Sequence, residues 1–294
     1  MWQGIGLVGV FVVVWLGYTI SGGKFGVILQ AAGPELLVIG GAGTMTLLIS
    51  NDTSTVKKVW DGLRKVFSGP KWKKTDYADA LCLMFLLVRV ARQEGNVALE
   101  RHIENPEKSA IFAHYPHFLA DKDLTAFISD VFRSITLNFT DAYKVGEMME
   151  TEVAKRYQEQ LRAAKALSTV ADAFPALGIV AAVLGIIKAM GAISESPQVL
   201  GHMISSALVG TFLGVFLSYA LVGPLAGRIR NVVDEENAMP NLIRQIITSH
   251  LDNLVPQLAV EVGRKSIPSK FQPSFNEMDG MLKEAAKVAR KGEG

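Results

Sequence analysis

The sequence predicts an all-α membrane protein with four transmembrane helices and a helical cytoplasmic domain. Of its 294 residues, 49% are hydrophobic, and its mean hydropathy is +0.26, which is too apolar for an ordinary soluble domain of this size. Four stretches have the length of about 20 mostly apolar residues that a helix needs to cross a bilayer. The long segment between the second and third stretches is polar and rich in good helix formers. These observations together predict a polytopic, helical chain.

The four predicted spans are residues 1–23, 25–50, 173–193 and 203–227, whose only charged side chains are Glu35 and Lys188. The first span lacks the basic n-region and the A-x-A-like cleavage site of a signal peptide, so we expect it to be a retained helix. A fifth apolar run, residues 81–88, lies between Asp79 and Arg89 and is too short to cross a bilayer. That run is predicted to be a buried core helix.

The distribution of basic residues predicts the orientation in the membrane. Apart from Lys24 and Lys188, every Lys and Arg lies in residues 51–168 or 225–294. Positive charge concentrates on the cytoplasmic side, so the large loop and both termini are expected to be cytoplasmic. The single cysteine, Cys82, excludes an intrachain disulfide and agrees with a reducing compartment.

The predicted organisation therefore has four parts. Residues 1–50 form transmembrane helices 1 and 2, and residues 51–168 form a cytoplasmic helical domain. Residues 169–227 form transmembrane helices 3 and 4, and residues 228–294 form a cytoplasmic helical segment and tail. No Gly or Pro occurs in residues 147–174, so one helix is expected to run from the cytoplasm into the third span. The basic stretch from residue 278 onward is expected to be frayed.

Residues 58–68 predict an amphipathic helix that ends at Gly69-Pro70. Its apolar stripe is formed by Val59, Trp60, Leu63, Val66 and Phe67, with Lys and Arg on the opposite side. Such a helix either lies on anionic lipid at the membrane surface or packs against its own domain. The sequence leaves both interpretations open.

Spans three and four carry small residues at four-residue spacing, which allows helices to approach closely in lipid. These residues are Ala181, Gly185 and Ala189 in the third span and Ser206, Gly210, Gly214 and Ser218 in the fourth. They indicate either tight packing within one subunit or the wall of a pore. Pro175 and Pro224 lie at the cytoplasmic ends of these two spans, where a matched pair favours a hinge over simple helix termination.

The two spans contain no Asp or Glu, although a path for protons or cations through lipid usually needs such a group. Glu35 in the second span is a lone carboxylate, which we place off the wall formed by spans three and four. A carboxylate supplied by a partner is the preferred interpretation. The chain is then one half of a channel.

No catalytic or metal-binding constellation is recognisable. In "HYPH", residues 114–117, Pro116 breaks the helical spacing of the histidines, and no Cys or carboxylate completes a ligand set, so a loop is expected. There is no G-x-x-x-x-G-K-[ST] or G-x-S-x-G motif. Basic residues are matched by acidic ones, which argues against nucleic-acid binding. We therefore expect no enzyme activity, no cofactor and no metal.

Several long segments resemble a known family. They are "RQEGNVALERHIENPEKSAIFAHYP", "DAFPALGIVAAVLGIIKAM", "LVGTFLGVFLSYALVGPLA" and "VEVGRKSIPSKFQPSF". In colinear order over nearly the whole chain, they are similar to the MotA/PomA family of flagellar motor stator subunits. The resemblance implies a pentameric ring around two copies of a MotB-type partner, which supplies the ion-binding Asp. It also implies that ion flow turns the ring and that its cytoplasmic rim pushes the rotor protein FliG, with membrane lipid around the spans.

The resemblance assigns the rotor contact to a charged segment. The family's charged contact residues correspond to Arg92 and Glu100 here. The neighbouring Glu94 and Arg101 have either the same role or only that of solvated surface charges.

The resemblance also assigns the ion path and its coupling. Pro175 and Pro224 correspond to two functional prolines, and Thr211 to a pore-facing threonine in the fourth span. Ala182 stands where sodium-driven relatives tend to carry Thr, which favours protons. Lys188 departs from the pattern, either to tune ion entry or merely to reach the membrane surface.

Three alternatives remain beside a proton-driven stator. The first is a sodium-driven stator. The second is a proton-driven subunit of the more distant ExbB/TolQ type, which typically has three spans rather than four. The third is a self-contained transporter, which the missing carboxylate in spans three and four disfavours.

Overall fold

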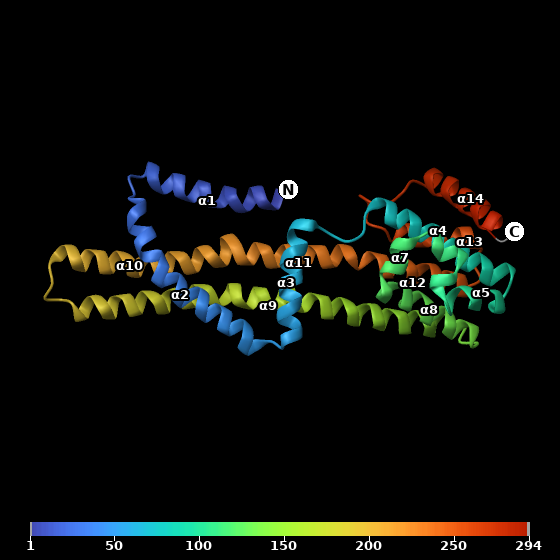
Figure 1. Ribbon diagram of the computed structural model, residues 1–294, viewed down its shortest axis with the longest axis horizontal. Helices are drawn as coiled ribbons and strands as arrows, with labels where there is room; N and C mark the ends of the chain where they lie inside the picture. The colour runs from blue at the N-terminus through green and yellow to red at the C-terminus, as the bar shows by residue number, and fades with distance from the viewer. Residues whose placement is uncertain (1, 293–294) are drawn as a thin grey trace. The chain divides into compact units, whose positions relative to one another are not determined.

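The computed structural model describes residues 2–292, and all regular elements in that range are helices (Figure 1). In chain order they are α1 (Trp2–Ile20), α2 (Phe25–Ser50), α3 (Thr53–Ser68), α4 (Lys74–Gln93), α5 (Asn96–Ile103), η1 (Pro106–Lys108), α6 (Ala110–Ala113), α7 (Pro116–Ala120), α8 (Lys122–Thr136), α9 (Ala142–Gly191), α10 (Pro197–Phe216), η2 (Leu217–Val222), α11 (Gly223–Glu236), α12 (Ala238–Leu251), α13 (Pro256–Lys265) and α14 (Phe275–Gly292). The predicted all-α class is confirmed.

The helices form two compact units. Unit 1 comprises Met1–Gly69 and Gln158–Val233, and unit 2 comprises Pro70–Tyr157 and Asp234–Gly294. Helix α9 contributes to both units, because the boundary falls within it. This confirms the expectation of one helix that continues from the polar segment into the third apolar stretch. The assignment of segments to membrane and cytoplasm stays a prediction.

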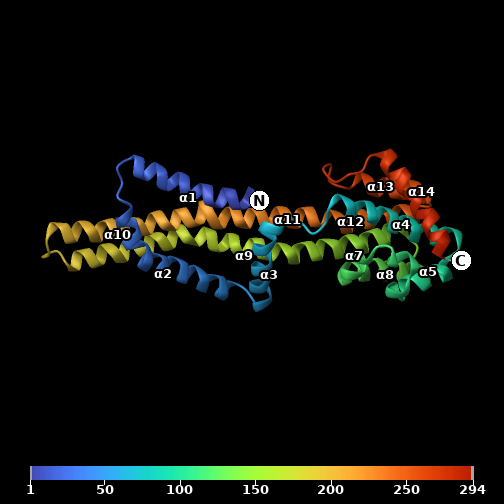
Figure 2. The ribbon, with the colours of Figure 1, turned by 45° about the horizontal axis from the view of Figure 1, so that its top comes forward.

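Unit 1 is built around the pairing of α9 with α10, which lie side by side and are joined by a short turn (Figures 1 and 2). Helix α2 packs against α10. Helix α1 makes aromatic contacts, with ring centroids 5.2 Å apart for Phe11 and Phe216 and 6.1 Å apart for Trp15 and Phe212. Edge-on ring pairs at these distances are favourable, so they attach a helix that has no fully buried residue of its own.

Four helical stretches are long and apolar enough to cross a membrane, namely Trp2–Ile20, Phe25–Ser50, Ala142–Gly191 and Pro197–Leu251. They contain the four predicted spans, except for the few residues at span ends that lie in turns. Large apolar side chains on these stretches face outward, among them Leu37, Ile187 and Leu208. An apolar surface of this extent suits lipid rather than water.

Unit 2 differs from unit 1 in that its large apolar side chains form a buried core, which is centred on α4. Every residue from Leu81 to Val88 is buried, as predicted for the fifth apolar run. Cys82 is 6% exposed and behaves as the small core hydrophobe that we expected, since burial raises the pKa of its thiol to about 11. Side chains from α5, α8, α12, α13 and α14 complete this core.

The prediction of a frayed basic tail is wrong for the described part of that segment. Residues Phe275–Gly292 form α14, in which Met278 and Leu282 are 2% and 3% exposed in the core of unit 2. Their spacing of four residues places both side chains on one face of the helix, which packs on α4. The many charged residues of the stretch obscured this pair. Residues 293–294 lie outside the described residues.

Helix α3 ends at Gly69 as predicted but begins earlier, at Thr53, and its apolar stripe is only half buried. The Asp52 side chain caps its first turn by accepting a hydrogen bond from the Thr55 N–H at 3.0 Å, and Gly69 ends it with a φ of +82°. Val59 and Val66 are buried, whereas Trp60 and Phe67 are 61% and 54% exposed. The two aromatic residues lie about 90° around the helix from the buried line, so packing on unit 1 does not cover them.

Candidate functional site

Helices α9 and α10 touch through their backbones. A Cβ atom added to Gly214 would lie 2.6 Å from the Phe174 carbonyl oxygen and 2.9 Å from the Gly178 Cα. One added to Gly178 would lie 2.9 Å from the carbonyl oxygen of Gly210. Only glycine fits at such separations, because real Cβ atoms do not approach other atoms so closely. The contact is therefore of the small-residue type that drives helix association in lipid.

The same contact continues toward the turn that joins the two helices. A Cβ on Gly185 would lie 2.7 Å from the Cβ of Ala207, and one on Gly210 would lie 3.2 Å from the Cβ of Ala181. Four residues of the predicted small-residue stripes, Ala181, Gly185, Gly210 and Gly214, thus serve packing within one chain. That interpretation of the stripes is confirmed for these four, and a pore-lining role stays a prediction.

Glu35 lies at this contact, although the sequence analysis placed it away from spans three and four. Its side chain is 8% exposed, and its Oε2 would lie 2.7 Å from a Cβ on Gly210. Within residues 2–292 its carboxyl group has no hydrogen-bond or ion-pair partner. A lone charge on an apolar helix does not show which way that helix faces, so the sequence did not predict this contact with α10; a place for Glu35 off the pore-facing wall stays a prediction. The Glu35 carboxyl group therefore lies next to Gly210, the residue before Thr211.

The two prolines interrupt the helices near one end of this contact. Pro175 lies inside α9, directly after Phe174, whose carbonyl meets Gly214. Pro224 is the second residue of α11 and follows the π-helix η2, in which the Gly223 N–H donates to the Ser218 carbonyl. Proline donates no hydrogen bond, and π-helical turns are rare and concentrate at functional sites. The backbone hydrogen bonds of both helix segments are therefore incomplete or irregular at these positions.

Thr211 and Ala182 flank the closest approach between Ala181 and Gly210, each one residue further along its own helix. Thr211 is half-buried on α10, and Ala182 is buried at 9% exposure on α9. The structure therefore brings two of the predicted ion-path residues to the same part of the helix pair as Glu35.

The four predicted rotor-contact residues lie around the break between α4 and α5 in unit 2. Gly95 makes this break with a φ of +86°, a conformation that other residues rarely adopt. Arg92, Glu94, Glu100 and Arg101 are all exposed. In the described part of the chain, Glu94, Glu100 and Arg101 have no ion-pair partner, so their charges are available to another molecule.

Arg92 differs from Glu94, Glu100 and Arg101 because its side chain is hydrogen-bonded within the chain. One guanidinium nitrogen, Nη1, donates to the carbonyl oxygens of Asn253 at 3.0 Å and Leu254 at 2.9 Å, in the turn between α12 and α13. Burial, with a smaller contribution from the Arg92 charge, lowers the pKa of His250. No pattern in the sequence pairs Arg92 with a turn about 160 residues away, so sequence reasoning missed this contact.

The "HYPH" segment adopts structure that was not expected. His114 follows α6, and His117 lies in the short helix α7 rather than in a loop, with its Nε2 3.7 Å from Asp79 and 4.0 Å from Asp76. Pro116 begins α7, where a proline is favoured because that N–H has no partner in a helix. No group of three metal-ligating side chains occurs among residues 2–292.

Two family profiles match the chain. The profile described as "Motility protein A N-terminal" matches residues 4–95, and that of the "MotA/TolQ/ExbB proton channel family" matches residues 120–241. The motility protein A of Escherichia coli is 37% identical over 266 residues, which cover 90% of both chains. The chain belongs to the motility protein A family.

Other members of the motility protein A family are similar over comparable lengths. The chemotaxis protein LafT of Vibrio parahaemolyticus is 33% identical over 95% of this chain and 98% of that relative. The motility protein A of Bacillus subtilis is 28% identical over 93% of both. The resemblance stated from sequence segments alone is thereby confirmed.

Solved structures share the fold. A chain of the structure "C. jejuni MotAB" superposes with a TM-score of 0.71 at 19% identity and covers 90% of this chain and 94% of that one. A chain of the flagellar MotAB stator complex from Bacillus subtilis superposes with a TM-score of 0.70 at 24% identity, covering 90% and 95%. Membership of the motility protein A family agrees with the predicted function class, and the second profile makes the chain a member of a proton channel family.

Proposed function

We propose that this chain is the ring-forming subunit of a proton-driven flagellar stator that turns ion flow into torque on the rotor protein FliG. One observation carries the proposal: the two apolar helices that pack backbone against backbone, α9 and α10, hold no carboxylate in residues 173–193 or 203–227. An ion path beside them needs an acidic group from elsewhere. The two solved structures of similar fold are described as MotAB, a name that includes a second subunit beside MotA.

The proposed partner is a MotB-type subunit that supplies the ion-binding Asp. Several copies of this chain, five in our proposal, surround two copies of that partner. Support comes from the outward-facing apolar side chains of unit 1, which leave room for contacts with other membrane helices. Glu35 lies next to Gly210 at the α9–α10 contact. It is the carboxylate that the predicted spans of this chain can themselves contribute near the ion path.

The proposed topology has four transmembrane helices with both termini in the cytoplasm. Residues 1–50 and 169–227 lie in the inner membrane, and residues 51–168 and 228–294 lie in the cytoplasm. The basic residues support this arrangement. Lys57 and Lys58 follow the second predicted span, and Arg228 and Arg230 follow the fourth, so the positive-inside rule favours the cytoplasmic side for these span ends.

The proposed output surface is the charged turn between α4 and α5. Arg92, Glu94, Glu100 and Arg101 present both signs of charge to solvent within ten residues. Exposed ion pairs are individually worth about 0–1 kcal/mol, and they steer a partner and release it quickly. Each ion that crosses 100 mV releases about 2.3 kcal/mol, so a stepping contact must be weak enough to break on every step.

Pro175 and Pro224 are the proposed hinge between the ion path and that output. Both interrupt the hydrogen-bond ladder at the same end of the α9–α10 contact, and the π-helix η2 adds a second irregularity beside Pro224. A proline in a membrane helix is tolerated where neighbouring helices or a local π-helical adjustment satisfy the freed backbone groups. A change in the charge of the partner's carboxylate can then bias two packings of the same helices.

The proposed ion is the proton. Ala182 offers no hydroxyl to a sodium ion at the position where sodium-driven relatives tend to carry Thr, and Thr211 is the hydroxyl nearest the Ala181–Gly210 contact in sequence. The match to the "Motility protein A N-terminal" profile over residues 4–95 favours a motor stator over an ExbB/TolQ-type subunit.

Proton flux in cells tests the proposal. We expect no flux, followed with a pH-sensitive fluorophore, when this chain is expressed alone, and flux when it is expressed with a MotB-type partner. The control is a partner whose membrane Asp is replaced by Asn, which is expected to abolish flux at unchanged protein level. Robust flux from this chain alone would contradict the half-channel. Swimming in sodium-free medium that stops on addition of a proton uncoupler supports the proton; swimming only with sodium overturns it.

A further inference from the structure

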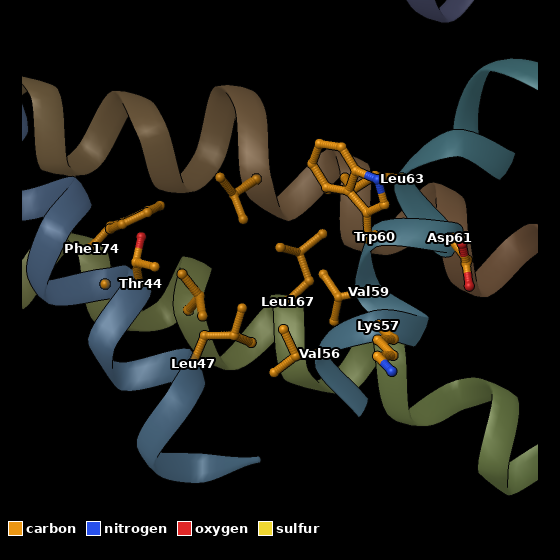
Figure 3. A pocket seen from close by; sticks show the side chains of 13 residues that line it. Thr44, Leu47, Val56, Lys57, Val59, Trp60, Asp61, Leu63, Leu167 and Phe174 are labelled. Atoms are coloured by element: carbon orange, nitrogen blue, oxygen red, sulfur yellow. The ribbon is translucent and has the colours of Figure 1, made fainter. Parts of the chain in front are cut away.

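Unit 1 contains an open apolar pocket of about 670 Å³ that the proposed function leaves unused (Figure 3). Its lining comes from α2, α3, α9 and η2. In Figure 3 the side chains of Leu47, Val56, Val59 and Leu167 converge on the space, with Phe174 at one end and Trp60 at the other. The volume lies within the ~300–1,000 Å³ usual for ligand pockets. A cavity this apolar and this open suits a hydrocarbon chain better than water.

Helix α3 forms the pocket wall that carries charge. Lys57 lies at the edge of the pocket and has no ion-pair partner within residues 2–292, whereas Asp61 pairs with Arg64 at 3.8 Å. The Arg64 guanidinium also lies 5.8 Å from the centre of the Trp60 ring. Because Asp61 already has a cationic neighbour, Lys57 is the unmatched charge at this opening.

The apolar face of α3 extends beyond the residues that pack against the rest of unit 1. Trp60 and Phe67 remain mostly exposed on the side of the helix that also carries Lys57 and Arg64. A helix with exposed aromatic residues bordered by basic ones is typical of the surface of an anionic membrane. Its position directly after α2, one of the four helices able to span a bilayer, agrees with that location.

We propose that this pocket binds one acyl chain of an anionic phospholipid of the cytoplasmic leaflet, with the lipid phosphate at Lys57. The proposal rests on the proposed topology, which places α3 at the cytoplasmic surface. The positive charge of Lys57 favours this occupant. A second copy of the chain would bring its own basic α3 surface to the pocket. An anionic phospholipid instead brings a hydrocarbon chain for the pocket and a negative charge for Lys57. It goes beyond the stator function because it assigns a ligand to a site that the ion path does not include.

The pocket also borders the proposed hinge. Phe174 and Val222 line it, and they lie one residue before Pro175 and two residues before Pro224. The ring of Phe174 in turn packs against Gly43 of α2, which leaves no room for a larger residue there. An acyl chain in the pocket therefore contacts residues that must move if the prolines act as hinges. A lipid that fits one hinge state better than the other shifts the population toward that state.

A photo-crosslinking experiment identifies the occupant. The chain is purified with its MotB-type partner and reconstituted in vesicles of equal parts phosphatidylglycerol and phosphatidylcholine. Trp60, which lines the pocket, is replaced by p-benzoylphenylalanine, and adducts are identified by mass spectrometry. The matched control carries the same group at Phe67, an exposed aromatic position on the same helix that does not line the pocket.

We expect phosphatidylglycerol adducts at position 60 to exceed phosphatidylcholine adducts about fivefold, the effect of one lysine at an anionic surface, and to be less enriched at position 67. Lys57→Gln removes the enrichment at position 60, whereas Lys58→Gln, a neighbouring lysine outside the pocket, leaves it unchanged. Val56→Phe, which fills the pocket, lowers all lipid adducts at position 60 and leaves those at position 67 unchanged.

Three results would overturn the proposal: equal lipid ratios at positions 60 and 67, equal effects of Lys57→Gln and Lys58→Gln, or an adduct at position 60 with a second copy of the chain. Adduct formation needs no ion flux, so failure of the lipid site and failure of the stator function are distinguishable.

Discussion

Units 1 and 2 place their apolar side chains in opposite ways. In unit 1, large apolar residues such as Leu208 and Ile187 are 65% and 62% exposed, and the closest internal contacts are made by glycines. In unit 2, large apolar residues such as Leu87 and Phe132 are fully buried, and the exposed turn between α4 and α5 carries charge. This difference is the one expected if unit 1 lies in lipid and unit 2 in water, as we propose: in water the burial of large side chains stabilises a fold, whereas in lipid close backbone packing does.

The comparison predicts opposite sensitivities to the same kind of substitution, and the largest effect is expected in the core of unit 2. Leu87→Ala removes a fully buried side chain and should cost about 2–5 kcal/mol, measured as faster hydrogen exchange of α4 amides in the purified complex. The matched variant Leu16→Ala, on the exposed face of α1 and away from the proposed ion path, should change the exchange of α1 by less than about 0.5 kcal/mol. Equal costs for the two variants would mean that this face of α1 is buried by a protein surface.

Unit 1 should instead be sensitive to the addition of a single carbon. Gly214→Ala places a Cβ 2.6 Å from the Phe174 carbonyl oxygen, so the α9–α10 contact must widen, at a cost of about 1–3 kcal/mol. The expected result is a loss of proton flux with the partner, by tenfold or more. Gly227→Ala is the control, because a Cβ there meets no atom within 4 Å. Normal flux in Gly214→Ala would show that the close contact is not needed for conduction.

The charged turn allows structural and contact roles to be separated. Arg92→Gln loses two charge-assisted hydrogen bonds to the carbonyls of Asn253 and Leu254, so we expect lower stability of unit 2, by about 1.5–3 kcal/mol, as well as reduced motility. Glu100→Gln has no partner to lose within the described residues, so motility alone should fall. Thermal unfolding and swim-plate diameter measure the two effects. A stability loss in Glu100→Gln would assign that residue a structural role.

The sequence predicted the four long helices, α3 and the core helix α4, because these depend on local patterns. Apolar length identified the four long helices, and the short run at residues 81–88, bounded by charge, identified the core helix of unit 2. Small-residue spacing identified Gly185, Gly210 and Gly214 of the α9–α10 contact but missed Gly178.

What the sequence missed depends on which faces meet across long separations. The rotation of α2 that brings Glu35 to Gly210, the clamp of Arg92 on the turn after α12, and the packing of α14 on α4 all join distant segments. A single sequence records the residues in such contacts but not their partners. The open pocket beside α3 is likewise the product of four elements, none of which signals a cavity by itself.

The smallest expected effect concerns the response of unit 2 to pH. Burial, and to a lesser degree the Arg92 charge, lowers the pKa of His250 in the folded state. The unfolded chain therefore binds a proton more readily, so the stability from the neutral His250 is present above its unfolded pKa and is lost as pH falls below it. We expect the midpoint of thermal unfolding to fall on acidification from pH 7 to 5, and to fall less in His250→Gln. Arg92→Gln should raise the pKa of His250, as followed by the NMR shift of its ring, and so reduce the acid sensitivity. An unchanged pKa in Arg92→Gln would show that burial alone sets it.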